Sequence, residues 1–211
     1  MRLTVFGATG AVGQEIVGQA LDAGHEVTAV VRDPDRLPEG PAWADLHAVV
    51  RLGDEEAVRA AVAGRDAVLS GLGPRARKDA GIAARLTRVV LAAMEAEQVR
   101  RVLAVSAGPV GPAPVNEGAV DRWMRGLVSA VLKDVYADLS EMEAELAASG
   151  TDWTVVRPPR LQDKPVTGVY RVVTGGFPAR GRFISRADVA HAMLGMIGDA
   201  GVVKQGVGVA Y

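Results

Sequence analysis

The chain has 211 residues, of which 49% are apolar and 23% charged, and its formal net charge is −1 at pH 7. This length and apolar content suffice for one hydrophobic core and are short for two domains, so we expect a single domain over residues 1–211. The near-neutral charge gives no basic field for nucleic acid or an anionic membrane, and the lack of cysteine excludes disulfides, thiol catalysis and Cys-ligated metal centres.

The three histidines, His25, His47 and His191, lie too far apart in the sequence to form a metal-binding motif. No apolar run approaches the roughly 18 residues needed to span a bilayer, and the N-terminus enters a strand without a signal pattern. We therefore expect a cytoplasmic monomer or homodimer that acts on a small molecule, with neither nucleic acid nor a membrane as partner.

Residues 2–13, RLTVFGATGAVG, predict a nucleotide-binding turn between a short buried strand and a helix over 11–23. A tight turn requires Gly7, close approach of a pyrophosphate requires Gly10, and close packing of the helix on the strand requires Gly13. The helix would direct its free N–H groups and positive dipole end at the phosphates. The predicted cofactor-binding residues of this loop are Gly7, Thr9, Gly10, Ala11, Val12 and Gly13.

The glycine spacing by itself also fits an ordinary strand-to-helix turn, and a second strand over 26–31 supports the nucleotide interpretation. An NAD-preferring site carries Asp or Glu where this strand ends, whereas this chain carries Arg32, with Arg36 one turn further on. Guanidinium groups bind a 2′-phosphate through bidentate hydrogen bonds, so we predict NADP(H) rather than NAD(H). Asp33 and Asp35 keep a second interpretation open, in which they pair with the arginines on the surface.

A third strand over 46–50 precedes Asp54 and a helix over 55–63. Asp54 could cap this helix or approach the adenine amino group. A fourth strand over 66–72 would lie beside the first, so its end must face the pyrophosphate and ribose. The predicted cofactor-binding residues there are Ser70, Gly71, Leu72 and Gly73.

A long helix follows, with apolar side chains on one face, and then a fifth strand over 101–105. Ser106 follows directly, where a nicotinamide or a substrate carbonyl would lie. We therefore predict it as a cofactor-binding and candidate catalytic residue, although a serine that simply ends a strand would also fit.

The loop 109–118 is rich in proline and glycine and predicts a mobile lid. An apolar stripe from Val120 to Val135 follows at helical spacing and is expected to be mostly core. Trp123 and Met124, near the lid, could instead line a hydrophobic substrate pocket. A separate helix around 139–146 would end before Gly150.

A sixth strand over 153–156 leads into a turn fixed by two prolines. Pro158 is predicted to border the nicotinamide, and Arg160 to line the substrate pocket. Beyond this turn we expect a strand over 168–173, a capping box from Ser185 to Asp188 that opens a last helix, and a short strand near 207–209. The segment from about 157 to 211 would form a small elaboration on the substrate side.

Alternating strands and helices predict an α/β fold with a Rossmann-like, doubly wound parallel sheet. Right-handed crossovers give the strand order 3-2-1-4-5-6, with helices on both faces.

Seven sequence motifs occur in the order expected for one known family. They are GATGAVG (7–13), VVRDPDRL (30–37), GDEE (53–56), SGLG (70–73), VSA (105–107), SGTDWTVVRPPRL (149–161) and ISRADVA (184–190). With them the chain resembles an atypical short-chain dehydrogenase/reductase of the NAD(P)H-binding group that includes NmrA-like proteins and biliverdin reductase B/flavin reductase. The resemblance implies a Rossmann domain that binds NADPH at the carboxyl ends of the strands.

Typical short-chain reductases use a Tyr with a Lys four positions later, which lowers the phenol pKa for proton transfer. Here Ser140 follows Tyr136 at that distance, Thr174 follows Tyr170, and Tyr211 is the last residue given. Hydride delivery without a dedicated acid suits a small conjugated acceptor such as a flavin or quinone. We therefore predict an NADPH-dependent reductase of this kind. A non-catalytic NADP(H) sensor of the NmrA-like type and a nucleotide-sugar-type epimerase or isomerase are the alternatives.

Overall fold

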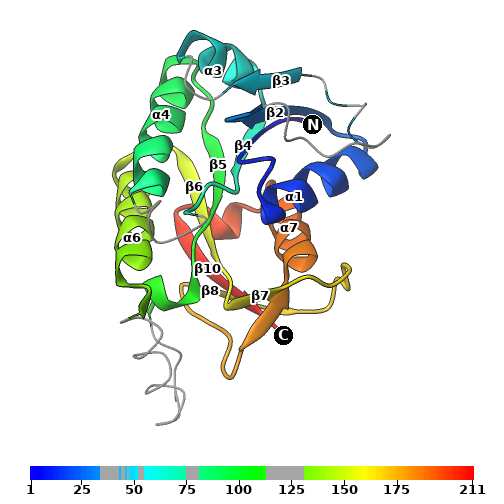
Figure 1. Ribbon diagram of the computed structural model, residues 1–211, viewed down its shortest axis with the longest axis vertical. Helices are drawn as coiled ribbons and strands as arrows, with labels where there is room; N and C mark the ends of the chain where they lie inside the picture. The colour runs from blue at the N-terminus through cyan, green and yellow to red at the C-terminus, as the bar shows by residue number, and fades with distance from the viewer. Residues whose placement is uncertain (34–42, 44–45, 47, 52–54, 75–80, 113–130) are drawn as a thin grey trace.

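The computed structural model describes residues 1–33, 43, 46, 48–51, 55–74, 81–112 and 131–211. An eight-stranded sheet with the order β3-β2-β1-β4-β5-β6-β10-β8 runs through the molecule (Figure 1). Its strands are β1 (Arg2–Phe6), β2 (Glu26–Val31), β3 (Ala48–Arg51), β4 (Ala67–Ser70), β5 (Arg101–Val105), β6 (Asp152–Arg157), β8 (Arg171–Thr174) and β10 (Gln205–Ala210). All neighbours pair in parallel except β10 and β8, which are antiparallel.

Helices cover both faces of this sheet (Figure 1). The helices α1 (Ala11–Asp22) and α7 (Arg186–Gly195) lie on one face, and α3 (Glu55–Val62), α4 (Ile82–Ala96) and α6 (Lys133–Ala148) lie on the other. The sequences of parallel strands that are buried on both faces are nearly continuous apolar runs. This explains why polar and apolar residues do not alternate strictly over residues 3–6. The fold is therefore a doubly wound α/β fold, as predicted.

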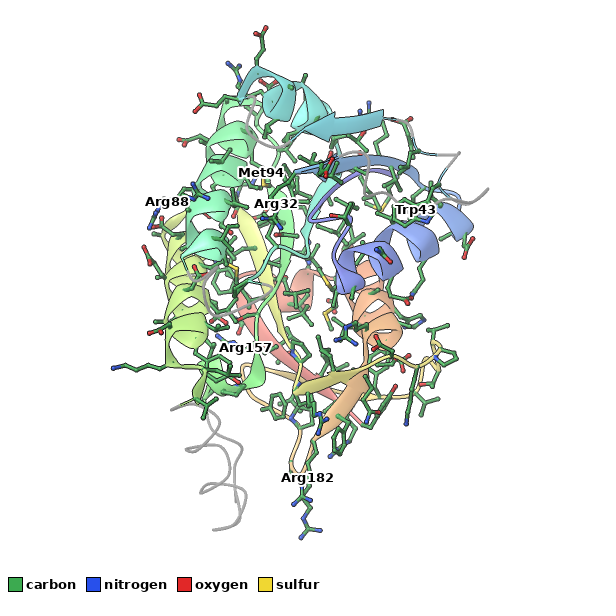
Figure 2. The ribbon with its side chains drawn as sticks, viewed as in Figure 1. Arg32, Trp43, Arg88, Met94, Arg157 and Arg182 are labelled. Carbon is green, nitrogen blue, oxygen red and sulfur yellow. The ribbon has the colours of Figure 1, made fainter. Side chains whose placement is uncertain are left out.

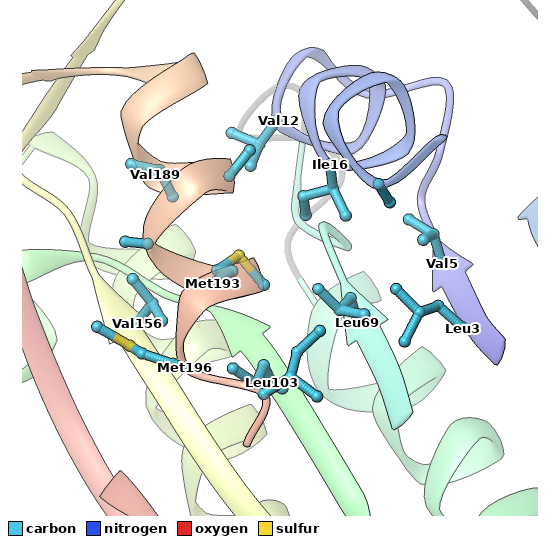
Figure 3. Packing of buried hydrophobic residues seen from close by; sticks show 14 of the residues in the cluster. Leu3, Val5, Val12, Ile16, Leu69, Leu103, Val156, Val189, Met193 and Met196 are labelled. Carbon is cyan, nitrogen blue, oxygen red and sulfur yellow. The ribbon is translucent and has the colours of Figure 1, made fainter. Parts of the chain in front are cut away.

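The core beneath α1 and α7 joins the two ends of the chain (Figure 3). Val12 and Ile16 of α1 and Met193 of α7 pack in one buried cluster with Leu69 of β4 and Leu103 of β5. The side-chain amide of Gln19 also donates a 2.9 Å hydrogen bond to the Ala187 carbonyl. The first helix and the last helix thus share one layer.

The predicted order 3-2-1-4-5-6 is confirmed, and the structure adds β10 and β8 beyond β6. Val135, assigned to the first of two predicted helices, belongs instead to α6, which runs from Lys133 to Ala148 and includes the helix expected around 139–146. Residues 120–130 of the predicted apolar stripe lie outside the described residues. Val131, assigned to the apolar stripe, is 52% exposed. The strand expected over 168–173 begins only at Arg171, because Gly168 adopts a φ of +67° that no strand continues.

A second, small sheet was not predicted. It pairs β7 (Arg160–Gln162) in parallel with β9 (Phe183–Ser185), and Leu161 lies opposite Ile184. This pairing brings the turn after β6 against the start of α7. A nearby 3-10 turn over Gly108–Val110 opens the expected lid, of which residues 113–118 lie outside the described residues.

The predicted capping box at the start of α7 is half formed. The Ser185 hydroxyl accepts a 2.9 Å hydrogen bond from the Asp188 N–H, but the Ser185 N–H donates to the Tyr211 hydroxyl instead of to Asp188. The fully buried Asp188 carboxylate accepts hydrogen bonds from Tyr211 (2.6 Å), from the Gly168 N–H (2.9 Å) and from the N–H and hydroxyl of Thr167 (both 2.8 Å). One carboxylate thereby joins three separate segments.

These contacts predict a loss of stability in acid. Burial raises the Asp188 pKa, but the hydrogen bonds from Tyr211, Gly168 and Thr167 outweigh it and lower the pKa from 3.8 to about 2. Because the folded pKa lies below the unfolded one, this stabilisation is complete above pH 4 and is lost as the pH falls toward 2. We expect a loss of roughly 2 kcal/mol of unfolding free energy from this group.

Urea unfolding between pH 2 and pH 5 measures this loss. Asp188→Asn should flatten the pH dependence, whereas Asp22→Asn, which removes an exposed carboxylate of α1, should retain it. An Asp188→Asn protein with the same pH dependence as the parent would contradict the assignment.

Within the described part of the chain, no helix is both long and apolar enough to cross a membrane. The same residues contain no group of three metal-ligating side chains.

Candidate functional site

The loop between β1 and α1 can be built only with glycine at its first position. Gly7 has a φ of +73°, and a Cβ there would lie 2.9 Å from the backbone carbonyl of Gly71. The Gly7 carbonyl accepts a 2.8 Å hydrogen bond from the Gly10 N–H, which closes the turn. The predicted role of Gly7 in a tight turn is confirmed.

The first turn of α1 packs directly on this loop. A Cβ at Gly13 would lie 2.2 Å from the Gly7 carbonyl oxygen, and a Cβ at Gly71 would lie 3.2 Å from the Gly13 nitrogen. Three stretches of backbone therefore meet without side chains between them. The packing role predicted for Gly13 is confirmed, and Gly71 serves the same purpose from the β4 side.

The N-terminus of α1 is left without a protein cap. Gly10 stands at the N-cap position and no side chain accepts a hydrogen bond there, and no acidic residue lies in the first turn. The first N–H groups of a helix have no partner within the helix, and together with the dipole they favour an anion. By contrast, Ser185 caps α7.

A cavity of about 650 Å³ opens in front of the loop and the ends of the strands. Many of the predicted site residues line it, namely Gly7, Thr9, Gly10, Ala11, Val12, Arg32, Gly71, Leu72, Gly73 and Ser106. The predicted residues Arg36, Asp54, Trp123 and Met124 lie outside the described residues.

Four predicted residues are described but do not line this cavity: Gly13, Ser70, Pro158 and Arg160. Ser70 is buried, and its hydroxyl lies 3.4 Å from the Leu72 N–H that donates to it. Pro158 is also buried, and its carbonyl accepts a 2.7 Å hydrogen bond from the Gly108 N–H.

Arg160 is exposed, and its guanidinium lies 6.0 Å from the centre of the Phe183 ring. Its neighbour Leu161 lines the cavity instead. Successive side chains of a strand point to opposite faces, so the predicted assignment is displaced by one residue along β7.

Arg32 lines the cavity and follows directly after the last residue of β2 (Figure 2). Its side chain is exposed and forms no ion pair with a carboxylate of the described residues. The alternative in which Asp33 pairs with Arg32 on the surface finds no support within that part of the chain. Asp35 and Arg36, the other residues of that alternative, lie outside the described residues.

Part of the cavity wall is apolar. The side chains that line it there come from α4, α6, β5 and β7, and they are Ile82, Leu86, Val135, Leu139, Val105 and Leu161. None of them was predicted as a site residue, because each is an ordinary apolar residue whose position depends on the packing of separate elements. Gln14, Val30, Pro74 and Arg186 complete the lining.

Ser106 also lines the cavity. It is only 7% exposed, its N–H donates a 2.8 Å hydrogen bond to the Val156 carbonyl, and its hydroxyl has no hydrogen-bond partner among the described residues. A buried hydroxyl without a partner costs about 1–3 kcal/mol, and a ligand group in the cavity would remove this cost.

None of the three tyrosines lines the cavity. Tyr136 is half-buried in α6, and burial raises its phenol pKa. The Tyr170 hydroxyl lies 2.7 Å from Nδ1 of His191, and the Tyr211 hydroxyl donates to Asp188. The described lining residues likewise contain no lysine, and therefore no Tyr-Lys pair. Lys78 lies outside the described residues.

A glycine turn, an uncapped helix and an open end of a doubly wound sheet define a Rossmann-type dinucleotide-binding protein. The family model for NAD(P)H-binding proteins matches residues 7–200, so the chain belongs to this NAD(P)H-binding family. The resemblance to atypical short-chain dehydrogenases/reductases is thereby confirmed.

Individual relatives agree with this assignment. The chain is 33% identical over 190 residues to a 3-diazoavenalumate denitrifying reductase from a Streptomyces species, covering 81% of this chain and 59% of that protein. It is 28% identical over 200 residues to an uncharacterized sugar epimerase, YhfK, from Bacillus subtilis, covering 92% of this chain and 86% of the relative.

A solved structure matches the fold. A short-chain dehydrogenase/reductase from Veillonella parvula superimposes with a TM-score of 0.80 at 20% identity, covering 99% of this chain and 93% of the other.

Proposed function

We propose that this protein is an NADPH-dependent reductase that delivers hydride to a small conjugated acceptor, such as a flavin or a quinone. One observation carries the proposal: the same cavity is lined by the uncapped end of α1, by a guanidinium without a carboxylate partner among the described residues, by apolar side chains and by a buried hydroxyl that has no partner within that part of the chain. The reductase among the relatives supports the same class of reaction, although this chain spans only 59% of that protein.

The residues present fit an NADP(H) cofactor. The N–H groups at the start of α1 and the bare backbone at Gly10 would hold the diphosphate, and Arg32 would hold the 2′-phosphate. The recess lined by Val105, Leu161 and the helices α4 and α6 would take the nicotinamide and the acceptor. Bound NADPH supplies a hydride.

The protein's own contribution would be orientation and exclusion of water. The apolar walls keep the recess dry and hold the acceptor against the cofactor. The Ser106 hydroxyl would donate a hydrogen bond to an acceptor oxygen, and the proton that balances the hydride would come from solvent. An acceptor that spreads negative charge over a conjugated system needs no stronger acid, which agrees with the described lining residues, none of which is a tyrosine or lysine.

We also propose that residues 1–211 form one domain in which 157–211 make up the substrate side. This segment contributes Leu161 and Arg186 to the cavity wall.

Calorimetric titration with NADPH and with NADH, followed in the same cell by a flavin or a quinone, tests the function. NADPH binding with oxidation that depends on the acceptor, seen as loss of NADPH absorbance, is the expected result. Tight binding without oxidation by any acceptor would favour the NADP(H) sensor. Production of an epimer from a nucleotide sugar without net oxidation would favour the epimerase.

Ser106→Ala should separate stability from turnover. Because the hydroxyl has no partner among the described residues, its removal should leave the unfolding free energy within about 0.5 kcal/mol of the parent value or raise it. Loss of the hydrogen bond to the acceptor should lower kcat/KM about tenfold. The control is Ser140→Ala on the exposed face of α6, which should change neither. Parental kcat/KM in Ser106→Ala would contradict the assigned role.

A further inference from the structure

We propose that Arg186 is a second anion-binding residue of the cavity, which takes an oxyanion other than the 2′-phosphate expected at Arg32. The oxyanion would be either the cofactor diphosphate or a carboxylate on the acceptor, since both offer paired oxygens to a guanidinium. The proposal rests on the proposed function, because it assumes that this cavity takes a dinucleotide and an acceptor.

The charge of the cavity wall is the first observation. Arg32 and Arg186 are the only charged residues among the described residues that line it, and both are arginines. Arg32 follows β2, on one side of the central strand β1, whereas Arg186 follows β9, beyond the opposite half of the sheet. A ligand that fills the cavity therefore meets two positive charges and, among the described lining residues, no negative charge.

The position of Arg186 in its helix does not explain its charge. It is the first residue of α7, where the helix dipole favours a negative side chain. Ser185 already supplies the cap, and Asp188 supplies the negative charge of the first turn. A basic residue is unfavourable for the helix at this place, and its presence points to a contact outside the helix.

Within the described residues, the only carboxylate that Arg186 pairs with is Asp163. The Asp163 side chain is 86% exposed, whereas that of Arg186 is 26% exposed. An ion pair of which one partner stands in water contributes little, so a ligand oxyanion can replace Asp163 at small cost.

Two contacts fix the helix end that carries Arg186 beside the cavity. The bond from Gln19 to the Ala187 carbonyl holds the start of α7 against α1, whose own N-terminus lies at the glycine loop. The pairing of Leu161 with Ile184 holds β9 against the strand whose Leu161 lines the apolar recess. Arg186 is therefore placed between the expected diphosphate and the expected acceptor.

Arg186→Gln tests the proposal by calorimetry, with Arg160→Gln as the matched control, since Arg160 is an arginine of the adjoining strand that does not line the cavity. If the diphosphate is the ligand, Arg186→Gln should weaken NADPH and NADH equally, about tenfold or more, and should leave the affinity for adenosine 2′-monophosphate, which carries no 5′-phosphate, unchanged. Arg186→Lys should restore part of the affinity.

If an acceptor carboxylate is the ligand, cofactor affinities should stay unchanged. Cinnamate should then bind the NADP⁺-loaded parent protein at least about tenfold more tightly than it binds Arg186→Gln, and cinnamamide should show no such difference. In either case Asp163→Asn should strengthen binding of the same ligand by about two- to fivefold, because it removes the competing carboxylate.

The proposal would be overturned if Arg186→Gln binds NADPH, NADH and cinnamate with the same affinity as the parent protein. It would also be overturned if cinnamate does not bind the parent protein and the substitution leaves NADPH binding unaffected. These are binding measurements, so they are distinct from a failure of the reductase proposal, which would appear as binding without turnover.

Discussion

Arg32→Ala is expected to weaken NADPH binding by more than about tenfold while leaving NADH binding almost unchanged. The guanidinium lines the cavity and forms no ion pair with a described carboxylate, so a 2′-phosphate would gain a charge-assisted contact worth roughly 1.5 to 3 kcal/mol. NADH lacks that phosphate, so its affinity should not depend on this contact. Parallel calorimetric titrations of both cofactors measure the difference directly.

The matched control for Arg32→Ala is Arg160→Ala, which removes an exposed arginine outside the cavity and should weaken neither cofactor. Equal weakening of NADPH and NADH by Arg32→Ala would refute a 2′-phosphate contact and would leave Arg32 as a general contributor to the field of the site.

Gly13→Ala is expected to destabilise the protein and to weaken cofactor binding, because among the described glycines Gly13 is where an added Cβ would make the closest contact. The added Cβ would lie 2.2 Å from the Gly7 carbonyl oxygen, so the helix and the loop must separate. Such overpacking typically costs about 1–3 kcal/mol, and it would displace the N–H groups that meet the diphosphate. Thermal unfolding and NADPH titration should therefore both show a loss, with binding at least about tenfold weaker.

Gly18→Ala makes the same chemical change in the same helix with the opposite expected sign. Nothing lies within 4 Å of a Cβ at Gly18, and alanine favours a helix over glycine by about 1 kcal/mol. A higher melting temperature for Gly18→Ala beside a lower one for Gly13→Ala would assign the damage to contact rather than to helix composition. Similar melting temperatures for the two variants would contradict the packing argument.

The centre of the fold could be predicted because its signals are local. A buried run such as LTVF, a glycine triplet and an apolar face at helical spacing are each contained in about a dozen residues, and the handedness of crossovers then fixes the strand order. The glycine contacts at Gly7 and Gly13 follow from the same local pattern.

The rest could not be predicted because it depends on contacts between distant segments. The β7–β9 pair joins residues more than twenty positions apart, and no repeating pattern of apolar residues in the sequence indicates this pairing. It decides that Leu161, rather than Arg160, lines the cavity, since one step along a strand reverses the side chain. Arg186 was missed for the same reason: the motif around it indicates a helix start, and only the packing of α7 on α1 brings it to the site.

The antiparallel pairing of β8 with β10 has a consequence for the order in which the sheet is assembled. Within the described chain β8 pairs only with β10, which begins some thirty residues after it, and β10 in turn pairs with β6. On a ribosome, β1 and β2 can join soon after synthesis, whereas β8 emerges before any strand it can join. Its four residues, all exposed along the sheet edge even in the native state, must wait as an unpaired strand until β10 is made. During the time before β10 pairs with it, the unpaired β8 strand of the growing chain is most open to pairing with another protein chain.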